Sequence, residues 1–329
     1  MKIGVTGANG LLGRSIVGAL QQLPKMEIRA LVRQLPRVES HPRTDWLLGD
    51  LARPEDCRAF VAGLDVVLHC AHKNSPLTSD GDWAQDARLN LIPALNLLGA
   101  IEGAKRCPHL IYPSSGGAVY GLSRAGVPFR ESDPCLPENS YGIQKLAVEH
   151  YLRVFAEREL LTATVLRIGN AYGWLLAPDR SQGFIGTAIN RVLHGQPVRL
   201  IGDPHNVRDY VYVDDILSAI FKVLEGRRGF EVFNVGSGVG ASVMDILALI
   251  ERKIGEPPLV HVETVVGAYR LPPWCVLDIT AANQQLGWHP RVSLEEGIIR
   301  MLDTAASSSA SSQPVHRPAD SDVLCPVRR

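Results

Sequence analysis

The stretch KIGVTGANGLLG at residues 2–13 decides the fold that we expect for this chain. Residues 2–6 predict a short strand, glycines follow at positions 7, 10 and 13, and apolar residues from position 16 onward predict a helix. A glycine-rich turn in this context lets the backbone approach a pyrophosphate, which the partial positive charge of the helix N-terminus stabilises. The stretch therefore predicts a dinucleotide site, although a plain strand-to-helix turn would also use glycines.

Strands and helices alternate through the first half of the chain. Strand-like segments recur at residues 27–32, 47–51, 66–72 and 110–113, and a helical apolar pattern covers residues 87–100. This alternation predicts an α/β fold, a parallel sheet covered by helices on both faces, whose ligand lies at the carboxyl ends of the strands.

Composition excludes several classes of function. The chain of 329 residues carries 34 basic and 34 acidic residues, so bulk charge gives no support for binding nucleic acid or a membrane surface. Its six cysteines are scattered without a CxxC pair, which argues against a zinc site or a disulfide framework. No long apolar run predicts a membrane span, and we expect a cytoplasmic protein.

Tyr141 and Lys145 are the candidate catalytic pair. They lie four residues apart in an amphipathic helical pattern, so both side chains project from one helix face. A neighbouring cation is expected to lower the pKa of a phenol below its reference value of about 10, giving a base for an alcohol proton. The alternative is an exposed tyrosine beside a solvated lysine.

Other polar residues at strand ends are candidate cofactor contacts. Arg33 follows the second strand and suits the 2′-phosphate of NADP, unless it only faces solvent. Asp50 is placed to accept a hydrogen bond from an adenine amino group. Asn90 is either a buried structural residue or a site residue, whereas packing or loop roles are expected for His69 and His72.

These motifs resemble the extended short-chain dehydrogenase/reductases, and within them the NAD-dependent nucleotide-sugar epimerases and dehydratases typified by UDP-glucose 4-epimerase. The resemblance covers residues 1–303. Its motifs are the Gly7, Gly10 and Gly13 turn, Gly49-Asp50-Leu51, Asn90, residues 114–121, Ser140-Tyr141-x-x-x-Lys145, Leu166-Arg167-x-x-Asn170-x-Tyr172-Gly173, residues 208–215 and Leu286-Gly287-Trp288-x-Pro290.

The resemblance implies a Rossmann-type doubly wound sheet with a smaller discontinuous C-terminal substrate lobe. The expected cofactor domain comprises residues 1–172 and about 207–240, the lobe about 173–206 and 241–303, and residues 304–329 a disordered tail. The cofactor is NAD, with NADP possible. Its expected contacts are Gly7, Asn9, Gly10, Leu11, Gly13, Arg33, Asp50, Leu51, Ala71, Asn90, Tyr141 and Lys145.

The resemblance also assigns chemistry. Tyr141 is the base and Lys145 holds the nicotinamide ribose, but the usual serine or threonine of the triad is replaced by Gly116. Either Ser115 takes that role through a shifted loop or the site works without the donor. The implied substrate is a nucleoside-diphosphate sugar contacted by Asn170, Arg208 and Arg270, and the implied assembly is a homodimer.

Three functions remain at this point. A 4-epimerase of a nucleoside-diphosphate hexose is expected first, acting by transient hydride transfer to bound NAD without a metal. The alternatives are an NADPH-dependent 4-keto sugar-nucleotide reductase and a non-catalytic dinucleotide-binding protein. A dehydratase is disfavoured because Gly117 and Ala118 stand where the 4,6-dehydratases carry an Asp-Glu pair.

Overall fold

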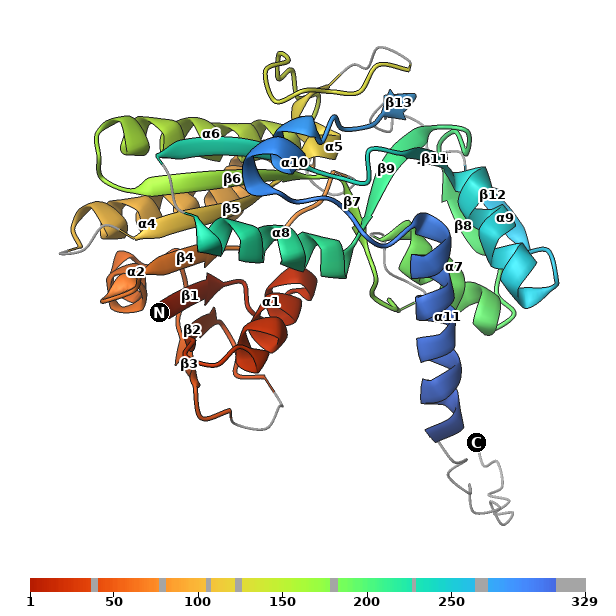
Figure 1. Cartoon of the computed structure of the whole chain (residues 1–329), viewed down its shortest axis with the longest axis horizontal. Helices are drawn as coiled ribbons and strands as arrows, with labels where there is room; N and C mark the ends of the chain where they lie inside the picture. Colours follow the sequence, from red (N-terminus) through yellow and green to blue (C-terminus); the bar gives the residue numbers. More distant parts are fainter. Residues whose placement is uncertain are drawn as a thin grey trace, which may run out of the picture.

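The computed structural model describes residues 1–36, 41–76, 81–104, 108–121, 126–177, 183–226, 229–263 and 272–311. A sheet of seven parallel strands forms the larger part of the molecule, in the order β10-β6-β5-β4-β1-β2-β3 (Figure 1). The strands are β1 (Lys2–Thr6), β2 (Glu27–Val32), β3 (Thr44–Leu48), β4 (Val66–His69), β5 (His109–Ser115), β6 (Thr162–Ile168) and β10 (Phe230–Val235). The predicted doubly wound parallel sheet is confirmed.

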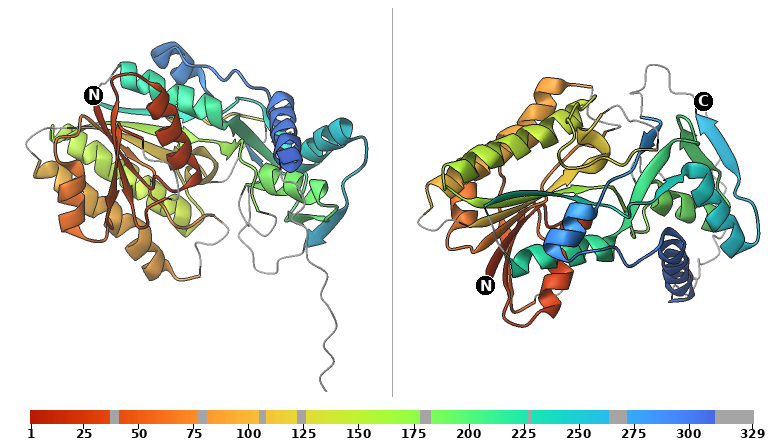
Figure 2. Two further views of the ribbon diagram at one scale, coloured as in Figure 1. Left: turned by 90° about the horizontal axis from the view of Figure 1, so that it is seen from below. Right: turned by 45° about the horizontal axis from the view of Figure 1, so that its top comes forward.

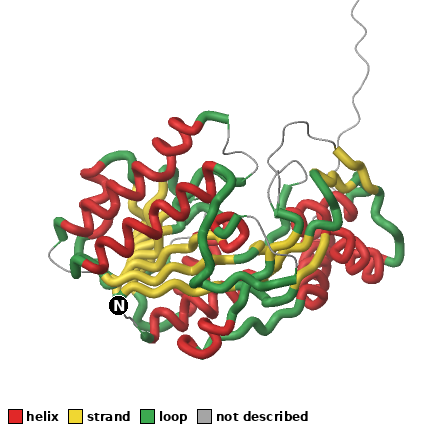
Figure 3. Tube along the Cα trace, turned by 90° about the horizontal axis from the view of Figure 1, so that it is seen from above, coloured by secondary structure: helices red, strands yellow, loops and turns green. Residues whose placement is uncertain are grey.

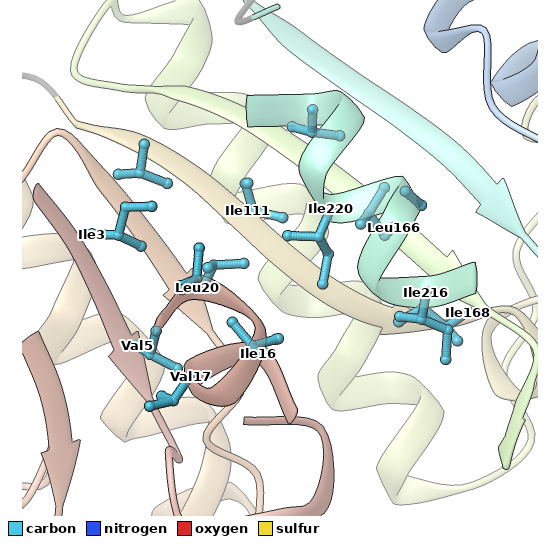
Figure 4. Close-up of a cluster of buried hydrophobic side chains, with 14 of the residues drawn as sticks. Ile3, Val5, Ile16, Val17, Leu20, Ile111, Leu166, Ile168, Ile216 and Ile220 are labelled. Atoms are coloured by element: carbon cyan, nitrogen blue, oxygen red, sulfur yellow. The ribbon is translucent and has the colours of Figure 1, made fainter. Parts of the chain in front are cut away.

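Helices cover both faces of this sheet. On one face, α1 (Leu11–Gln22), α8 (Val213–Glu225) and α10 (Thr280–Leu286) bury aliphatic side chains against the strands. Figure 4 shows Ile16 and Leu20 of α1 and Ile216 and Ile220 of α8 beside the sheet. On the other face lie α2 (Pro54–Val61), α4 (Ile92–Glu102) and α6 (Ser140–Glu157). Because both faces are buried, the central strands are almost continuously apolar.

The helix predicted over residues 87–100 has a more complex start. It comprises a short helix α3 (Trp83–Asp86), a π-helical segment η1 (Ala87–Leu91) and then α4. Proline at position 93 lies in the first turn of α4, where its missing N–H costs no helical hydrogen bond. The π-helical segment carries Asn90, whose buried side chain faces the loop that follows β4.

A smaller lobe lies beside the carboxyl ends of the central strands (Figures 2 and 3). One sheet joins β7 (Asn170–Tyr172), β9 (Val207–Tyr212), β11 (Gly240–Ser242) and β13 (Trp274–Cys275), and a second pairs β8 (Val198–Ile201) with β12 (Val260–Glu263). Its helices are α7 (Phe184–Leu193), α9 (Val243–Ile254) and α11 (Leu294–Ser311). Ser242 caps α9 in a capping box with Asp245.

Two details differ from the sequence-based boundaries. Strand β9, expected with the cofactor domain, pairs within the smaller lobe, while β10 joins the central sheet. Helix α11 continues to Ser311 and buries Ala305, so ordered structure extends past residue 304, where the tail was expected to begin. A helix remains favourable there because Met301, Leu302 and Ala305 pack against the lobe.

Candidate active site

Tyr141 and Lys145 project from the first turns of α6. Asn139 caps this helix, its side-chain oxygen accepting a hydrogen bond of 2.7 Å from the Gly142 N–H. Lys145 is buried, and its Nζ donates a hydrogen bond of 2.9 Å to the Pro113 carbonyl at the end of β5. The same nitrogen lies 5.7 Å from the centroid of the Tyr141 ring. Helix and sheet together therefore fix the cation beside the phenol.

Burial controls the protonation of both groups. Desolvation lowers the pKa of Lys145 to about 8, against the opposing charges of Cys70 and Glu149. Desolvation also raises the pKa of Tyr141 to about 12, and a hydrogen bond from Ser115 only partly offsets this rise. The pKa of Tyr141 is therefore raised and not lowered as expected from the neighbouring lysine, because burial of the phenol is the largest effect on it.

Ser115 is the serine that reaches Tyr141. Their side chains are hydrogen-bonded, whereas the neighbouring Ser114 hydroxyl turns away and donates to Glu149. A side chain at Gly116 has no room, because a Cβ there would lie 2.6 Å from the Leu277 side chain. The structure thus places Ser115 beside the phenol and supports the first of the two alternatives left open by the sequence.

A buried network of polar side chains connects Ser114 of β5 with α6, β6 and β10. Arg167 of β6 and Glu149 of α6 form an ion pair of 2.8 Å whose side chains are 7% and 4% exposed. Arg167 also donates to the Tyr120 hydroxyl, which donates in turn to Asn234 of β10. Sequence reasoning missed Glu149, although its spacing of four and eight residues from Lys145 and Tyr141 puts all three on one face of α6.

The glycine turn has the shape that a dinucleotide requires. Gly7 adopts a φ of +65°, and a Cβ there would lie 2.7 Å from the backbone of Ala71. A Cβ at Gly13 would lie 2.3 Å from the Gly7 carbonyl oxygen. Helix α1 starts at Leu11 with no side-chain cap and no acidic residue in its first turn, so its N–H groups face a potential anion. These residues fit a bound pyrophosphate.

The other candidate cofactor residues lie around this turn. Arg33 is exposed directly after β2, and the Asn9 side chain donates to the Gln34 carbonyl at 2.7 Å. Asp50 follows β3 and accepts a hydrogen bond from the Ala52 N–H at 2.9 Å, while Leu51 beside it is buried. The carboxyl ends of β1, β2 and β3 thus bring these residues to one edge of the sheet.

Asn90, His69 and His72 lie at the loop that follows β4 or contact it. Asn90 accepts a hydrogen bond from the Lys73 N–H and donates to the Asp86 carbonyl, which favours the structural alternative for this residue. His69 is buried and hydrogen-bonded to Thr6 at 2.8 Å, so its predicted packing role is confirmed. His72 contacts Tyr141 edge-on, with ring centroids 4.8 Å apart, and burial lowers its pKa.

A cavity of about 620 Å³ joins the two lobes at this site. Ser115, Tyr141 and Lys145 line it from the larger part, and Asn170 and Arg208 line it from β7 and β9. Asn170 is hydrogen-bonded to Tyr210, and Arg208 is held by a hydrogen bond of 2.7 Å to the Val207 carbonyl. Arg270 lies outside the described residues. Sequence reasoning also missed lining residues of the lobe, namely Trp174, Leu176, Phe184, Arg191 and Arg199.

Two negative findings concern the described ranges alone. No cluster of three or more histidine, cysteine, aspartate or glutamate side chains there could hold a metal ion. None of the helices in those ranges is long and apolar enough to cross a membrane.

The parallel sheet, the glycine turn and the Tyr141–Lys145 pair at a two-lobed cavity define a dinucleotide-dependent enzyme of the short-chain dehydrogenase/reductase type. A family model described as "NAD dependent epimerase/dehydratase family" matches residues 3–236. The chain belongs to this family. Its sequence is 29% identical over 312 residues to the dTDP-4-dehydro-6-deoxyglucose reductase of Escherichia coli, covering 91% of this chain and 95% of the relative.

Solved structures agree with this placement. The UDP-glucose 4-epimerase of Thermotoga maritima with UDP-glucose is 31% identical and superposes with a TM-score of 0.83, covering 94% of this chain and 100% of that one. The UDP-glucose 4-epimerase of Thermus thermophilus in complex with NAD is also 31% identical, with a TM-score of 0.82 over 92% of this chain and 98% of that one.

Proposed function

We propose that this protein is a nucleotide-sugar epimerase that inverts carbon 4 of a nucleoside-diphosphate hexose with NAD as its cofactor. The observation that carries the proposal is the single cavity lined by Ser115, Tyr141, Lys145, Asn170 and Arg208. The similarity to epimerase structures described with UDP-glucose and with NAD supports both ligand classes.

The proton-transfer roles follow from the geometry of α6. Tyr141 is the base that takes the proton of the sugar hydroxyl on its phenolic oxygen, and it returns the proton when the hydroxyl is re-formed. Ser115, already hydrogen-bonded to Tyr141, orients that hydroxyl. Protonated Lys145, held by the Pro113 carbonyl, would oppose the desolvation that raises the pKa of Tyr141. Bound NAD would accept a hydride from carbon 4 and give it back, so no net oxidation occurs.

The nucleotide part is assigned to the smaller lobe. Arg208 presents a planar guanidinium at the cavity, which suits two-point contact with a diphosphate. Asn170 of β7 pairs with Tyr210 of β9, two residues after this arginine. The proposed Arg270 contact rests on the family resemblance alone.

The cavity lining disfavours the dehydratases of the same family. Among the described residues that line it, Asp203 is the sole carboxylate, and it lies in the loop after β8 of the smaller lobe. Water elimination from the sugar needs an acid and a base close to the reacting carbons. Neither Gly117 nor its neighbours supply such a group beside Tyr141.

A reductase is the second candidate. Arg33 is exposed at the carboxyl end of β2, where it could contact the 2′-phosphate of NADPH, and one relative of similar identity is a dTDP-sugar reductase. In that reaction the same phenol would donate a proton to a 4-keto oxygen, and NADPH would be consumed.

The proposal includes a homodimer in the cytoplasm. Trp83 of α3 is 73% exposed, and Ile92 of α4 and Ile143 of α6 are 46% and 55% exposed, so the helical face opposite the sheet carries large apolar side chains. Such side chains favour contact with a second copy. The four cysteines in the described ranges are unpaired thiols, which is usual for a reducing compartment.

The test is turnover of a nucleotide-sugar panel by the purified chain, followed by proton NMR of the sugar. We expect interconversion of carbon-4 epimers without consumption of reduced cofactor. Tyr141→Phe should lower kcat by about 100-fold or more, whereas Tyr151→Phe, an exposed tyrosine on the same helix, should leave it unchanged. Equal activity of Tyr141→Phe would overturn the catalytic assignment, and NADPH-dependent reduction of a 4-keto sugar would establish the second candidate.

A further inference from the structure

Leu277, at the edge of the smaller lobe, fills the space where a side chain on residue 116 would stand. A Cβ at Gly116 would lie 2.6 and 2.8 Å from the two methyl carbons of Leu277 and 3.2 Å from the Arg167 carbonyl oxygen. Gly116 does not have a positive φ. Glycine is therefore required here by lack of space and not by backbone conformation.

The backbone around Leu277 is fixed from two directions. Its N–H donates to the Asp209 carboxylate at 3.2 Å, and Asp209 also accepts hydrogen bonds from Ser237 and Gly238. On the other side, Phe129 donates from its N–H to the Val276 carbonyl and accepts from the Asp278 N–H. The Leu277 backbone is thus held on both sides, and its side chain is 1% exposed within a buried cluster that includes Val119 and Phe129.

Gly116 adjoins the hydrogen-bonded pair of Ser115 and Tyr141 through the chain itself. Ser115 ends β5 and directly precedes Gly116, the first residue of helix α5 (Gly116–Val119). Cys275 adds a contact from its sulfur to the Gly116 carbonyl oxygen at 3.6 Å. Leu277 therefore packs against the chain at Gly116, directly next to the serine that is hydrogen-bonded to Tyr141.

We propose that Leu277 is a positioning residue that sets the place of Ser115 against Tyr141, in a chain whose residue 116 carries no side chain. Asp209 is its anchor, and it follows Arg208 directly in β9. Strand β9 therefore carries both Arg208, the proposed diphosphate contact, and Asp209, which accepts the hydrogen bond from the Leu277 backbone. The predicted effect on kcat rests on the proposed function, whereas the predicted packing of Leu277 against residue 116 does not depend on it.

The kinetic test is a double-mutant cycle between Ser115 and Leu277. We expect Leu277→Ala to lower kcat by about tenfold with KM changed less than about twofold, because a misplaced donor affects the reacting atoms and not nucleotide binding. Adding Ser115→Ala to Leu277→Ala should cost much less than Ser115→Ala costs alone. If the factors by which Ser115→Ala and Leu277→Ala lower kcat simply multiply in the double variant, the proposal is wrong, since Leu277 then does not act through Ser115.

The structural test needs no turnover. Gly116→Ala should lower the melting temperature of the otherwise unchanged chain, and it should lower it much less in the Leu277→Ala background, where only the contact of 3.2 Å with the Arg167 carbonyl oxygen remains. A melting temperature lowered equally in both backgrounds would refute the packing argument. This readout decides the packing even if the epimerase assay fails for every nucleotide sugar.

Two further variants guard against a trivial loss of folding. Leu277→Val removes less volume and should give a smaller loss of kcat in the same direction. Leu247→Ala truncates another buried leucine of the smaller lobe that does not line the cavity. It should lower the melting temperature and leave kcat unchanged, and an equal loss of kcat in Leu247→Ala would mean that general destabilisation explains the Leu277 result.

Discussion

The Glu149–Arg167 pair gives the strongest prediction about what holds the site together. The Glu149 carboxylate accepts hydrogen bonds from Arg167 Nη2 at 2.8 Å and Nε at 3.1 Å, and also from the Ser114 hydroxyl. Glu149→Gln leaves the guanidinium buried without a counter-charge, which typically costs 3–5 kcal/mol. Because Arg167 retains its bonds to Tyr120 and to the Glu131 carbonyl, we expect a loss of about 3 kcal/mol in the free energy of unfolding, measured by urea denaturation.

The same variant should affect catalysis through the serine segment. The Ser114 hydroxyl then donates to a neutral amide oxygen in place of a carboxylate, so Ser115 beside it is held less well against Tyr141, and kcat should fall by about tenfold while KM changes little. The matched control is Glu157→Gln on the same helix, since Glu157 pairs with Arg153 at 2.9 Å but both side chains are more than half exposed. That exposed pair should contribute less than about 0.5 kcal/mol.

A paired replacement separates charge burial from packing. Glu149→Met combined with Arg167→Met removes both charges and should recover most of the stability lost in Glu149→Gln, because neither ion is left alone. Equal losses of stability for Glu149→Gln and Glu157→Gln would refute the reasoning, as would a double variant no more stable than the single one.

Three further predictions address the charge, the substrate and the cofactor turn. The pKa of Lys145 lies near 8 in the folded chain against 10.5 ordinarily, so the unfolded state binds more protons at this group between these values. Burial raises the pKa of the Cys57 and Cys70 thiols, which lowers stability over the same range in both variants. The stability of the unaltered chain relative to Lys145→Met should therefore rise by about 2 kcal/mol from pH 8 to pH 10 in paired denaturation curves. Arg208→Lys keeps the positive charge but loses the planar guanidinium, so the affinity for UDP, measured by calorimetry, should fall about tenfold. An undiminished affinity would show that Arg208 does not contact the nucleotide. Gly7→Ala should lower the free energy of unfolding by about 3 kcal/mol or more and abolish dinucleotide binding, because Gly7 has a positive φ and lies close to the Ala71 backbone. The control Gly99→Ala adds a methyl group in open space on α4 and should stabilise the chain slightly.

The fold and the candidate catalytic pair were readable from local pattern. Glycines placed between a strand and a helix predict the nucleotide turn, and four-residue spacing predicts that Tyr141 and Lys145 share a face; both follow from short-range geometry.

What the sequence could not reveal depends on burial and on long-range contacts. The rise in the pKa of Tyr141 comes from desolvation, which no residue pattern displays. Glu149 looks like any charged residue of a helix until Arg167 is found on the neighbouring strand β6. Leu277 lies 161 positions after Gly116, and only the folded chain shows why residue 116 has no side chain.

The most direct test of the central claim is to denature the freshly purified protein and identify the dinucleotide that it releases. An epimerase returns its hydride in every cycle and need not exchange its cofactor, so the account predicts close to one equivalent of NAD per chain. An empty site that binds NADPH far more tightly than NADH would contradict it, assign a function to Arg33 and establish the reductase.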